Sequence, residues 1–321
     1  REALGLDRIT LARYRNAGCN NADQPERCPL GDGESVFHDA GEIDGREDTA
    51  FAVLLGSHTI LMAPTEMSAT APLKVATRSG GFRAATMPGF LPSMIPALRL
   101  DYGEINRRVN LLKEFLDAAE TARFRFTARG ERHDLVLDLR HREGHASGGL
   151  FPANGIAGNL PSGEAYTVPY EGEIEGDASG TAGTLPLQID GELVIYRIEN
   201  NRVVEVLSEG PESERERAHF AAEPAYANVS ELGLGVLGDF GLSPTGSILL
   251  DEKLGLHIAF GRSDHFGGTV GPGDFSGPDA VIHLDRVFIK DGMPDVNVDW
   301  VKLEGPGLDR TIITGGTFVQ L

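Results

Sequence analysis

The chain has few cysteines and no long apolar run. Its 321 residues include two cysteines, Cys19 and Cys28, and a disulfide framework or a structural zinc site would need more partners at close spacing. We therefore expect reduced thiols. No apolar run approaches the roughly 18 residues that span a bilayer, and the first residues lack the basic and apolar segments of a secretory signal. The sequence predicts a cytoplasmic protein that crosses no membrane.

Basic residues are also scarce. The chain carries 29 Lys and Arg against 48 Asp and Glu, which gives a formal net charge of −19. Binding of DNA or RNA requires a basic surface that neutralises phosphates, so we expect no nucleic-acid partner. An anionic membrane surface is disfavoured for the same reason. An acidic surface instead mildly favours cationic ligands such as divalent metal ions and free amino groups.

Two common catalytic signatures are missing as well. No glycine loop followed by Lys-Ser/Thr is present, so the sequence shows no sign of a phosphate-cradling loop. The stretches "GFLPS" and "NLPSGE" do not match the Gly-X-Ser-X-Gly pattern of a nucleophile elbow. The chemistry must therefore be sought in other residue types.

The first half of the chain alternates between strand-like and helix-like segments. The strand-like segments are 51–64, 82–89 and 122–130, and the helix-like segments are 68–81 and 103–120. The last of these has one apolar stripe at i+3 and i+4 spacing, formed by Ile105, Val109, Leu112, Leu116 and Ala119. This order predicts an α/β domain with a mostly parallel sheet over residues 1–127, in which 1–48 is irregular.

The second half consists mainly of short strands separated by Gly, Asn and Asp turns. Strand-like segments include "HDLVLDLR", "ELVIYRIENNRVVEVL", "SILLDE", "LHIAFG" and "AVIHLDRVFI", and "IENNRVV" is typical of a hairpin turn. A single helix is expected over 211–222. We predict a β-rich, barrel-like domain over 128–321, so the fold class of the chain is α+β.

Four ionisable residues of this half lie in apolar or glycine-rich surroundings: Glu231, His257, His283 and Asp285. His283 and Asp285 are two positions apart in "AVIHLDRVF", so on a strand they share a face. Burying such groups separately is unfavourable. A shared divalent ion would satisfy them together, and zinc, cobalt and iron accept mixed imidazole and carboxylate ligands.

Other interpretations of the same residues stay open. A single histidine on a strand is more often a hydrogen-bonded group than a ligand. A His-X-Asp sequence is also typical of a structural pair in which the carboxylate fixes the imidazole tautomer. A thiolate site is excluded because both cysteines lie in the first half, and calcium is disfavoured because imidazole is a poor ligand for it.

The motifs "NLPSGEAYT", "SELGLG", "ILLDEKLGLHIAFGRSDHFGG" and "IHLDRV" occur in this order between residues 130 and 290. In this they resemble the thermophilic metallo-aminopeptidases, the aminopeptidase T or leucyl aminopeptidase-like family. The resemblance implies an N-terminal α/β domain, a β-rich domain with two co-catalytic divalent metal ions per chain, and a homodimer. It also implies that a metal-activated water removes N-terminal residues from peptides or small amides.

The resemblance also implies a ligand set, which consists of Glu164, Glu231, His257, His283 and Asp285. Within this set we expect Asp285 to bridge the two metals, with His283 beside it. Glu164 is either the last ligand or the general base that takes the proton from the water.

One position departs from the family pattern. The peptidases have a tyrosine seven residues after the first histidine, where this chain has Asp264, followed by His265. We expect His265 to stabilise the oxyanion or one of these two residues to donate a proton in its place.

A more distant resemblance links the chain to the Fe(II)-dependent dioxygenases that open 2,5-dihydroxypyridine rings. Those enzymes use two histidines and one aspartate on iron. Their His-X-Asp matches His283 and Asp285, but their other histidine would align with Glu231. The sequence therefore favours a hydrolase, with a ring-cleaving dioxygenase and a non-catalytic metal-binding relative as alternatives.

Overall fold

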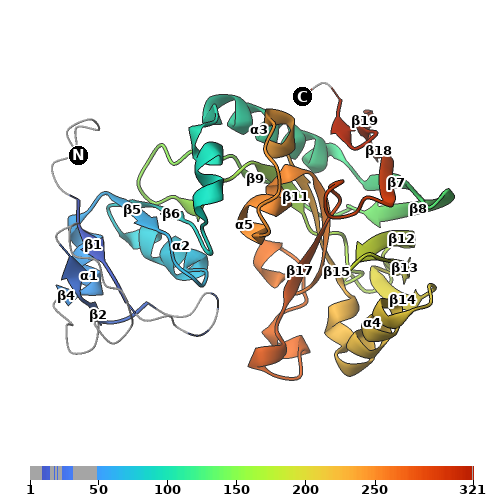
Figure 1. Cartoon of the computed structure of the whole chain (residues 1–321), viewed down its shortest axis with the longest axis horizontal. Helices are drawn as coiled ribbons and strands as arrows, with labels where there is room; N and C mark the ends of the chain where they lie inside the picture. Colours follow the sequence, from blue (N-terminus) through green and yellow to red (C-terminus); the bar gives the residue numbers. More distant parts are fainter. Residues whose placement is uncertain (1–8, 15–17, 19, 21–23, 32–48, 320) are drawn as a thin grey trace. The chain divides into compact units, whose positions relative to one another are not determined.

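The computed structural model describes residues 9–14, 18, 20, 24–31, 49–319 and 321, and the chain divides into two compact units. Unit 1 comprises Arg1–Pro92 with Gly149–Pro161, and unit 2 comprises Ser93–Gly148 with Ser162–Leu321 (Figure 1). Cys19 and most of the expected irregular region lie outside the described residues. Cys28 is buried.

Unit 1 is built around a three-stranded parallel sheet, which confirms the predicted parallel sheet of the N-terminal part. Its order is β10 (Ala157–Asn159), β6 (Arg83–Thr86) and β5 (Ile60–Ala63), with α2 (Thr70–Ser79) between β5 and β6 along the chain. Leu73 of α2 and Phe82 form a buried cluster with alanines of the sheet. Two short antiparallel pairs complete the described part: β1 (Leu11–Ala12) with β3 (Leu30–Gly31), and β2 (Arg27–Cys28) with β4 (Thr49–Ala50).

The prediction of a strand at the start of the 51–64 segment is wrong. Residues Phe51–Ser57 form the helix α1, and β5 begins only at Ile60. Phe51 and Leu54 are three positions apart, so they share one face of the helix and pack together against Cys28. The apolar run was too short for its period to separate a buried strand from a helix.

Unit 2 contains an open eight-stranded antiparallel sheet in the order β14-β13-β12-β8-β7-β18-β19-β20. Its strands are β7 (Thr121–Ala128), β8 (Glu131–Asp138), β12 (Ala182–Ile189), β13 (Glu192–Glu199), β14 (Arg202–Val206), β18 (Val296–Gly305), β19 (Leu308–Thr314) and β20 (Thr317–Phe318). Asn200 and Asn201 have φ of 49° and 64°, which forms the predicted hairpin turn between β13 and β14.

A second sheet of unit 2 has five antiparallel strands in the order β17-β16-β15-β11-β9. They are β9 (His145–Ser147), β11 (Glu164–Thr167), β15 (Val229–Gly235), β16 (Leu256–Gly261) and β17 (His283–Val287). Every residue of β15 and β16 is buried. The β-rich C-terminal part is thus confirmed, although among the described strands neither sheet closes into a barrel, because each has two edge strands.

Two longer helices accompany these sheets. The helix α3 (Tyr102–Ala118) packs against β9 and β11, and it buries the stripe predicted from the sequence (Figure 1). Asp101 caps it by accepting hydrogen bonds from the backbone of Gly103 and Glu104. The helix α4 (Pro211–Ala222) has the predicted bounds and packs against β13 and β14.

Shorter helices lie in the loops. They are η3 (Pro92–Arg99), η4 (Pro224–Ala227), η5 (Leu237–Phe240), α5 (Ile248–Asp251), η6 (Glu252–Leu254), η7 (Asp264–Phe266), η8 (Pro272–Asp274) and η9 (Pro278–Ala280). The strand expected for "SILLDE" is therefore wrong. The Asp251 carboxylate accepts hydrogen bonds from the backbone of Thr245 and Gly246, which holds this segment in a turn-and-helix conformation.

The boundaries of the compact units differ from the predicted domain boundary between residues 127 and 128. The helix α3 and the strand β7 belong to unit 2 rather than to the α/β unit. The reason is topological: β7 pairs with β8 and β18 in the eight-stranded sheet instead of extending the parallel sheet.

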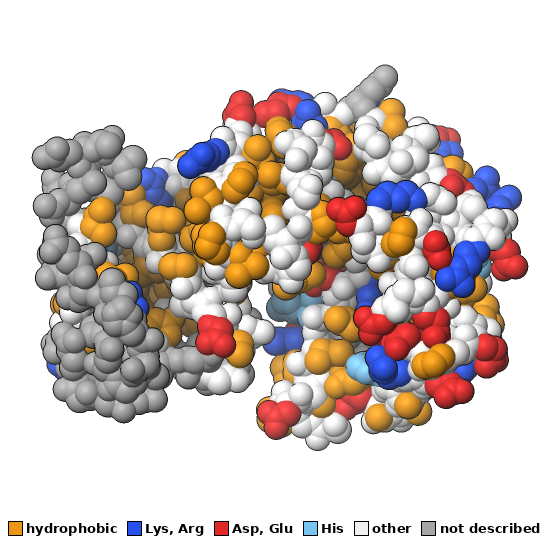
Figure 2. Space-filling view, in the orientation of Figure 1, with side chains coloured by type: hydrophobic (Ala, Val, Ile, Leu, Met, Phe, Trp, Pro, Cys, Tyr) orange, Lys and Arg blue, Asp and Glu red, His pale blue; other side chains and the backbone are white. Residues whose placement is uncertain are grey.

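The surface of unit 2 carries interspersed acidic and basic side chains (Figure 2). On the eight-stranded sheet Arg125 pairs with Asp134 at 2.9 Å, and Arg123 pairs with Glu304 at 2.6 Å. Exposed pairs of this kind contribute at most about 1 kcal/mol each. In the described part of the chain, no helix has the length and apolar character needed to cross a membrane.

The stripe of α3 gives a direct test of the fold. We expect Leu112→Ala to lower the free energy of unfolding of unit 2 by about 2–5 kcal/mol, because Leu112 is fully buried. Glu114→Ala, on the exposed side of the same helix, is the matched control and should change it by less than about 0.5 kcal/mol. Urea denaturation followed by the fluorescence of Trp300, the single tryptophan, measures both. Equal effects of the two variants would contradict the assigned packing of α3.

Candidate functional site

The predicted metal-site residues all lie on one face of the five-stranded sheet. Directly paired residues of neighbouring strands share a face, as do residues i and i+2 of one strand. Gly233 of β15 pairs with Tyr166 of β11 and with His257 of β16. Ala259 of β16 pairs with Glu231 and with Asp285. Since Glu164 is two positions before Tyr166, and His283 two before Asp285, these side chains meet on the same face.

Small residues on this face leave room for the long ones. A Cβ atom on Gly233 would lie 1.8 Å from Nε2 of His257, so the imidazole occupies the space above this glycine. A Cβ on Gly235 would lie 2.3 Å from the backbone of Lys253, which passes over the same face. The glycines of "SELGLG" are therefore explained by close approach of a side chain and of a neighbouring segment.

His283 presents one nitrogen to two carboxylates. Its Nδ1 lies 2.8 Å from the carbonyl oxygen of Arg262, so Nδ1–H donates to this acceptor. Its Nε2 then faces Oε2 of Glu231 at 2.9 Å and Oδ1 of Asp285 at 3.6 Å. Three lone-pair-bearing atoms converge, and a cation, either a proton or a metal ion, must lie among them to offset their repulsion.

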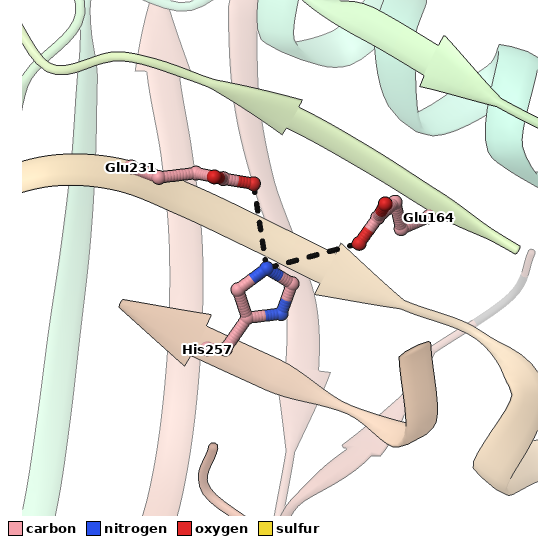
Figure 3. A group of neighbouring side chains, drawn as sticks. All are labelled: Glu164, Glu231 and His257. Carbon is pink, nitrogen blue, oxygen red and sulfur yellow. Dashed lines mark hydrogen bonds and ion pairs between the residues drawn. The ribbon is translucent and has the colours of Figure 1, made fainter. Parts of the chain in front are cut away.

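His257 has a similar arrangement on the other side of Glu231. Its Nε2 lies 3.4 Å from Oε1 of Glu231 and 3.8 Å from Oε2 of Glu164 (Figure 3). The three side chains come from β16, β15 and β11, and all are buried. The buried Nδ1 of His257 has no hydrogen-bond partner among the described residues.

The ligand atoms form two overlapping groups, each with atoms within 4.8 Å of one another. One group consists of Glu164, Glu231 and His257, and the other of Glu231, His283 and Asp285. All five predicted ligands are thus brought together, and the donor set suits a divalent ion with mixed nitrogen and oxygen ligands. Glu231, rather than the expected bridging residue Asp285, is common to both groups and directs one carboxylate oxygen to each.

Ionisation in this cluster is strongly perturbed. Burial would raise the pKa of Glu231, but hydrogen bonds and positive charge from His257 and His283 lower it well below its usual range. Burial would lower the pKa of His257, but its hydrogen bond to Glu231 and nearby carboxylates raise it to about 9. In the same way Asp285 and Glu231 raise the pKa of His283 well above its ordinary value. Without a metal ion, protons supply the missing positive charge.

A buried lysine that the sequence interpretation missed completes the cluster. Nζ of Lys253 donates a hydrogen bond to Oε1 of Glu164 at 2.9 Å and a second to Glu252, and the lysine side chain is fully buried. These two carboxylates raise the pKa of Lys253 against the effect of burial, so it stays charged. Burial and the neighbouring Glu164 and Asp285 raise the pKa of Glu252 to about 8. The charged triplet "DEK" is typical of a solvent-exposed turn, so the sequence gave no indication that Lys253 is buried beside the cluster.

Asp264 and His265 occupy the edge of the site. Asp264 forms an ion pair with Arg262 at 2.6 Å and belongs to neither ligand group. His265 lies beside His283, with ring centroids 5.3 Å apart in an edge-on arrangement. Burial and the charges of His283 and Arg262 lower the pKa of His265 to about 4, so its imidazole is neutral at pH 7.

The carboxylate of Glu171 holds the loop that carries these two residues. Oε1 of Glu171 accepts hydrogen bonds from Ser263 at 2.6 Å and Asn228 at 2.8 Å. Its Oε2 accepts from the backbone and hydroxyl of Thr269. Glu171 therefore ties Ser263 and Thr269 of the loop to Asn228, which directly precedes β15, and keeps His265 next to His283.

Comparison with known proteins identifies structures with a similar fold but does not determine the activity. No protein-family profile and no curated protein matches the sequence. The structure is similar to 2,5-dihydroxypyridine dioxygenase from Pseudomonas putida KT2440, with a TM-score of 0.60 and 16% identity over 83% of this chain and 73% of that chain. It is also similar to wild-type AmpT from Thermus thermophilus, with a TM-score of 0.50 and 19% identity over 74% of this chain and 65% of that chain. Both sequence resemblances are confirmed at the level of a shared fold, which is compatible with either activity.

The space above Gly233 can be tested directly. We expect Gly233→Ala to displace the imidazole of His257 and to lower the free energy of unfolding by about 1–3 kcal/mol, as overpacking of a buried site does. Gly273→Ala is the control, because a Cβ there meets no atom within 4 Å. Trp300 fluorescence during denaturation gives the stability. An unchanged His257 position in a crystal structure of Gly233→Ala would contradict the assigned geometry.

The buried ion pairs of Lys253 give a further prediction. Lys253→Met leaves Glu164 and Glu252 buried without their counter-charge, so we expect a loss of about 3–5 kcal/mol in the metal-free protein. Lys113→Met removes an exposed pair with Asp117 and should change stability by no more than about 1 kcal/mol. If the two substitutions had similar effects on the urea midpoint, the buried role of Lys253 would be refuted.

Proposed function

We propose that the chain is a metal-dependent, aminopeptidase-like hydrolase. The observation that supports this most is the position of Glu231, whose two oxygens face two separate groups of buried nitrogen and oxygen ligands. Such an arrangement suits two cations close together, as in metal-assisted hydrolysis. We assign Glu231 and His257 to one cation, and Glu231, His283 and Asp285 to the other, with Glu164 beside the first cation as the general base.

The bound ions would polarise the amide carbonyl and lower the pKa of a water molecule. Glu164 is the side chain we assign as general base. Its Oε1 accepts the hydrogen bond from Lys253, whereas Oε2 faces the cluster. The ion pair thus fixes the orientation of the carboxylate and leaves one oxygen to take the proton of the attacking water.

The charge of the site supports a preference for a free amino group. Glu164 and Glu252 bind the ammonium group of Lys253, and Glu231 and Asp285 belong to the neighbouring ligand groups. A free substrate amine could bind one of the cations or donate a hydrogen bond to one of these carboxylates, whereas an acylated amine loses both interactions. This restricts cleavage to the N-terminal residue of a peptide or to a small amide with a free amine.

The ring-cleaving dioxygenase is the competing function. It would place two histidines and one carboxylate on a single iron. In this chain His257 and His283 fall into different ligand groups, with Glu231 between them. We therefore favour hydrolysis and treat oxygen chemistry as an outcome of the test.

The ligand assignment predicts the behaviour of a Glu231 variant. Titration of the metal-free protein with Zn²⁺ or Co²⁺ should show two ions per chain, and Glu231→Gln should weaken binding by more than about 100-fold, since even outer-shell changes account for about 10–100-fold. Glu205→Gln, which removes an exposed charge from β14, should bind as the wild type does. Calorimetry and metal analysis measure both. Full metal content in Glu231→Gln would show that the assignment is wrong.

The activity has its own test on the metal-loaded wild type. We expect hydrolysis of aminoacyl p-nitroanilides, and a rate at least about tenfold lower when the substrate amine is acetylated, because the acylated nitrogen can neither bind a cation of the site nor form a charge-assisted hydrogen bond to a carboxylate. Oxygen consumption by the Fe(II)-loaded protein with 2,5-dihydroxypyridine, without amide hydrolysis, would overturn the proposal in favour of the dioxygenase.

A further inference from the structure

Tyr166 lies on the same sheet face as the proposed ligands and has no role in the scheme above. It is two positions after Glu164 on β11 and pairs directly with Gly233, the glycine over which the His257 imidazole packs. Its hydroxyl interacts electrostatically with Glu164 and Glu231. The phenol is therefore part of the surroundings of the ligand cluster.

The ring of Tyr166 is held on two sides. The imidazole of His145 from β9 stacks on it with centroids 5.1 Å apart, and the ring of Phe266 from η7 contacts it edge-on at 4.9 Å. His145 and Phe266 are themselves joined, because Nε2 of His145 lies 3.0 Å from the carbonyl oxygen of Phe266. Three segments thus fix the orientation of the phenol, which is what a group that must meet a reacting atom requires.

The hydroxyl of Tyr166 has no hydrogen-bond partner among the described residues. Two other tyrosines of unit 2 do use theirs: Tyr170 donates to the carbonyl of Asp177 at 2.7 Å, and Tyr196 donates to Glu216. The hydroxyl of Tyr166, on the face that carries the ligand cluster, is therefore available to donate to a bound ligand.

We propose that Tyr166 is a catalytic residue whose hydroxyl donates a hydrogen bond to the carbonyl oxygen of the scissile amide. The inference rests on the proposed hydrolase function and adds a residue to it. As water attacks the carbonyl carbon, negative charge develops on this oxygen and the hydrogen bond becomes stronger. No covalent bond to Tyr166 forms, and its proton stays on the phenol oxygen.

This assignment differs from the expectation for Asp264 and His265. Asp264 is ion-paired with Arg262 and, as an anion, has no proton to donate. His265 belongs to an exposed turn whose position depends on the loop contacts of Glu171. Tyr166 instead projects from a strand inside the sheet, next to Glu164.

Tyr166→Phe removes only the hydroxyl, and Tyr226→Phe is a matched control. Tyr226 is also partly buried, it packs against His219 and Phe275, and its hydroxyl has no hydrogen bond to a described residue. For Tyr166→Phe we expect kcat on an aminoacyl p-nitroanilide to fall about 10²–10³-fold with KM changed only a few-fold, as for loss of an oxyanion donor. The Zn²⁺ content should equal that of the wild type. For Tyr226→Phe we expect wild-type kinetics.

A binding measurement separates catalysis from structure. A 1-aminoalkylboronic acid, which forms a tetrahedral anion resembling the attacked carbonyl, should bind Tyr166→Phe about 10–100-fold more weakly than the wild type, in line with loss of one hydrogen bond to a charged oxygen. If Tyr166→Phe had the kcat and the boronate affinity of the wild type, the role of Tyr166 would be wrong, and the proposed hydrolase function would be unaffected. A wild-type protein that hydrolyses no aminoacyl amide would overturn the proposed function, and the role of Tyr166 with it.

Discussion

The buried negative charge on one face of the five-stranded sheet is the constraint on which the site depends. Glu231 has a carboxylate oxygen of Glu164 within 4.8 Å on one side and one of Asp285 within 4.8 Å on the other, where the low dielectric makes their repulsion strong. Lys253 and the two imidazoles offset part of it, and they do so as protonated groups when no metal is bound. A divalent cation would replace the imidazole protons. The same interaction therefore stabilises the sheet and prepares it to bind metal.

Small uncharged residues provide the space in which these charged side chains lie. Gly233 and Ala259 have little or no side chain, so the imidazole of His257 and the carboxylates on either side can lie flat above β15 and β16. The opposite face of these strands, with Leu232, Ile258 and Phe260, packs into the core. Strands of the sheet thus fix the ligands, while the more exposed Asp264 and His265 depend on a loop that Glu171 holds. The ligand positions are therefore fixed by strands, whereas the positions of Asp264 and His265 can vary with the loop.

The sequence revealed those parts of the site that local pattern encodes. The i, i+2 spacing of His283 and Asp285 was sufficient to place them on one face, and the apolar stripe of 103–120 was sufficient to predict α3. Lys253 was missed because its partner Glu164 lies on β11, 89 residues earlier in the chain. No local sequence pattern indicates a contact over such a separation. The segments 51–57 and 247–252 were predicted as strands because short apolar runs carry too few periods to distinguish the two structures. Tyr166 could have been found from its i+2 relation to Glu164.

The proposed function depends on the identity of residue 231. An imidazole at this position would give one neutral donor to one metal, as a two-histidine, one-carboxylate iron site requires. A carboxylate has two oxygens and a negative charge, so it can face His257 with one oxygen and His283 with the other. It thereby increases the number of positive charges the cluster needs. A single iron would leave one of the two histidine–carboxylate groups dependent on a proton, whereas two divalent ions satisfy both. The charge balance at Glu231 is thus the physical argument for the hydrolase function that we propose.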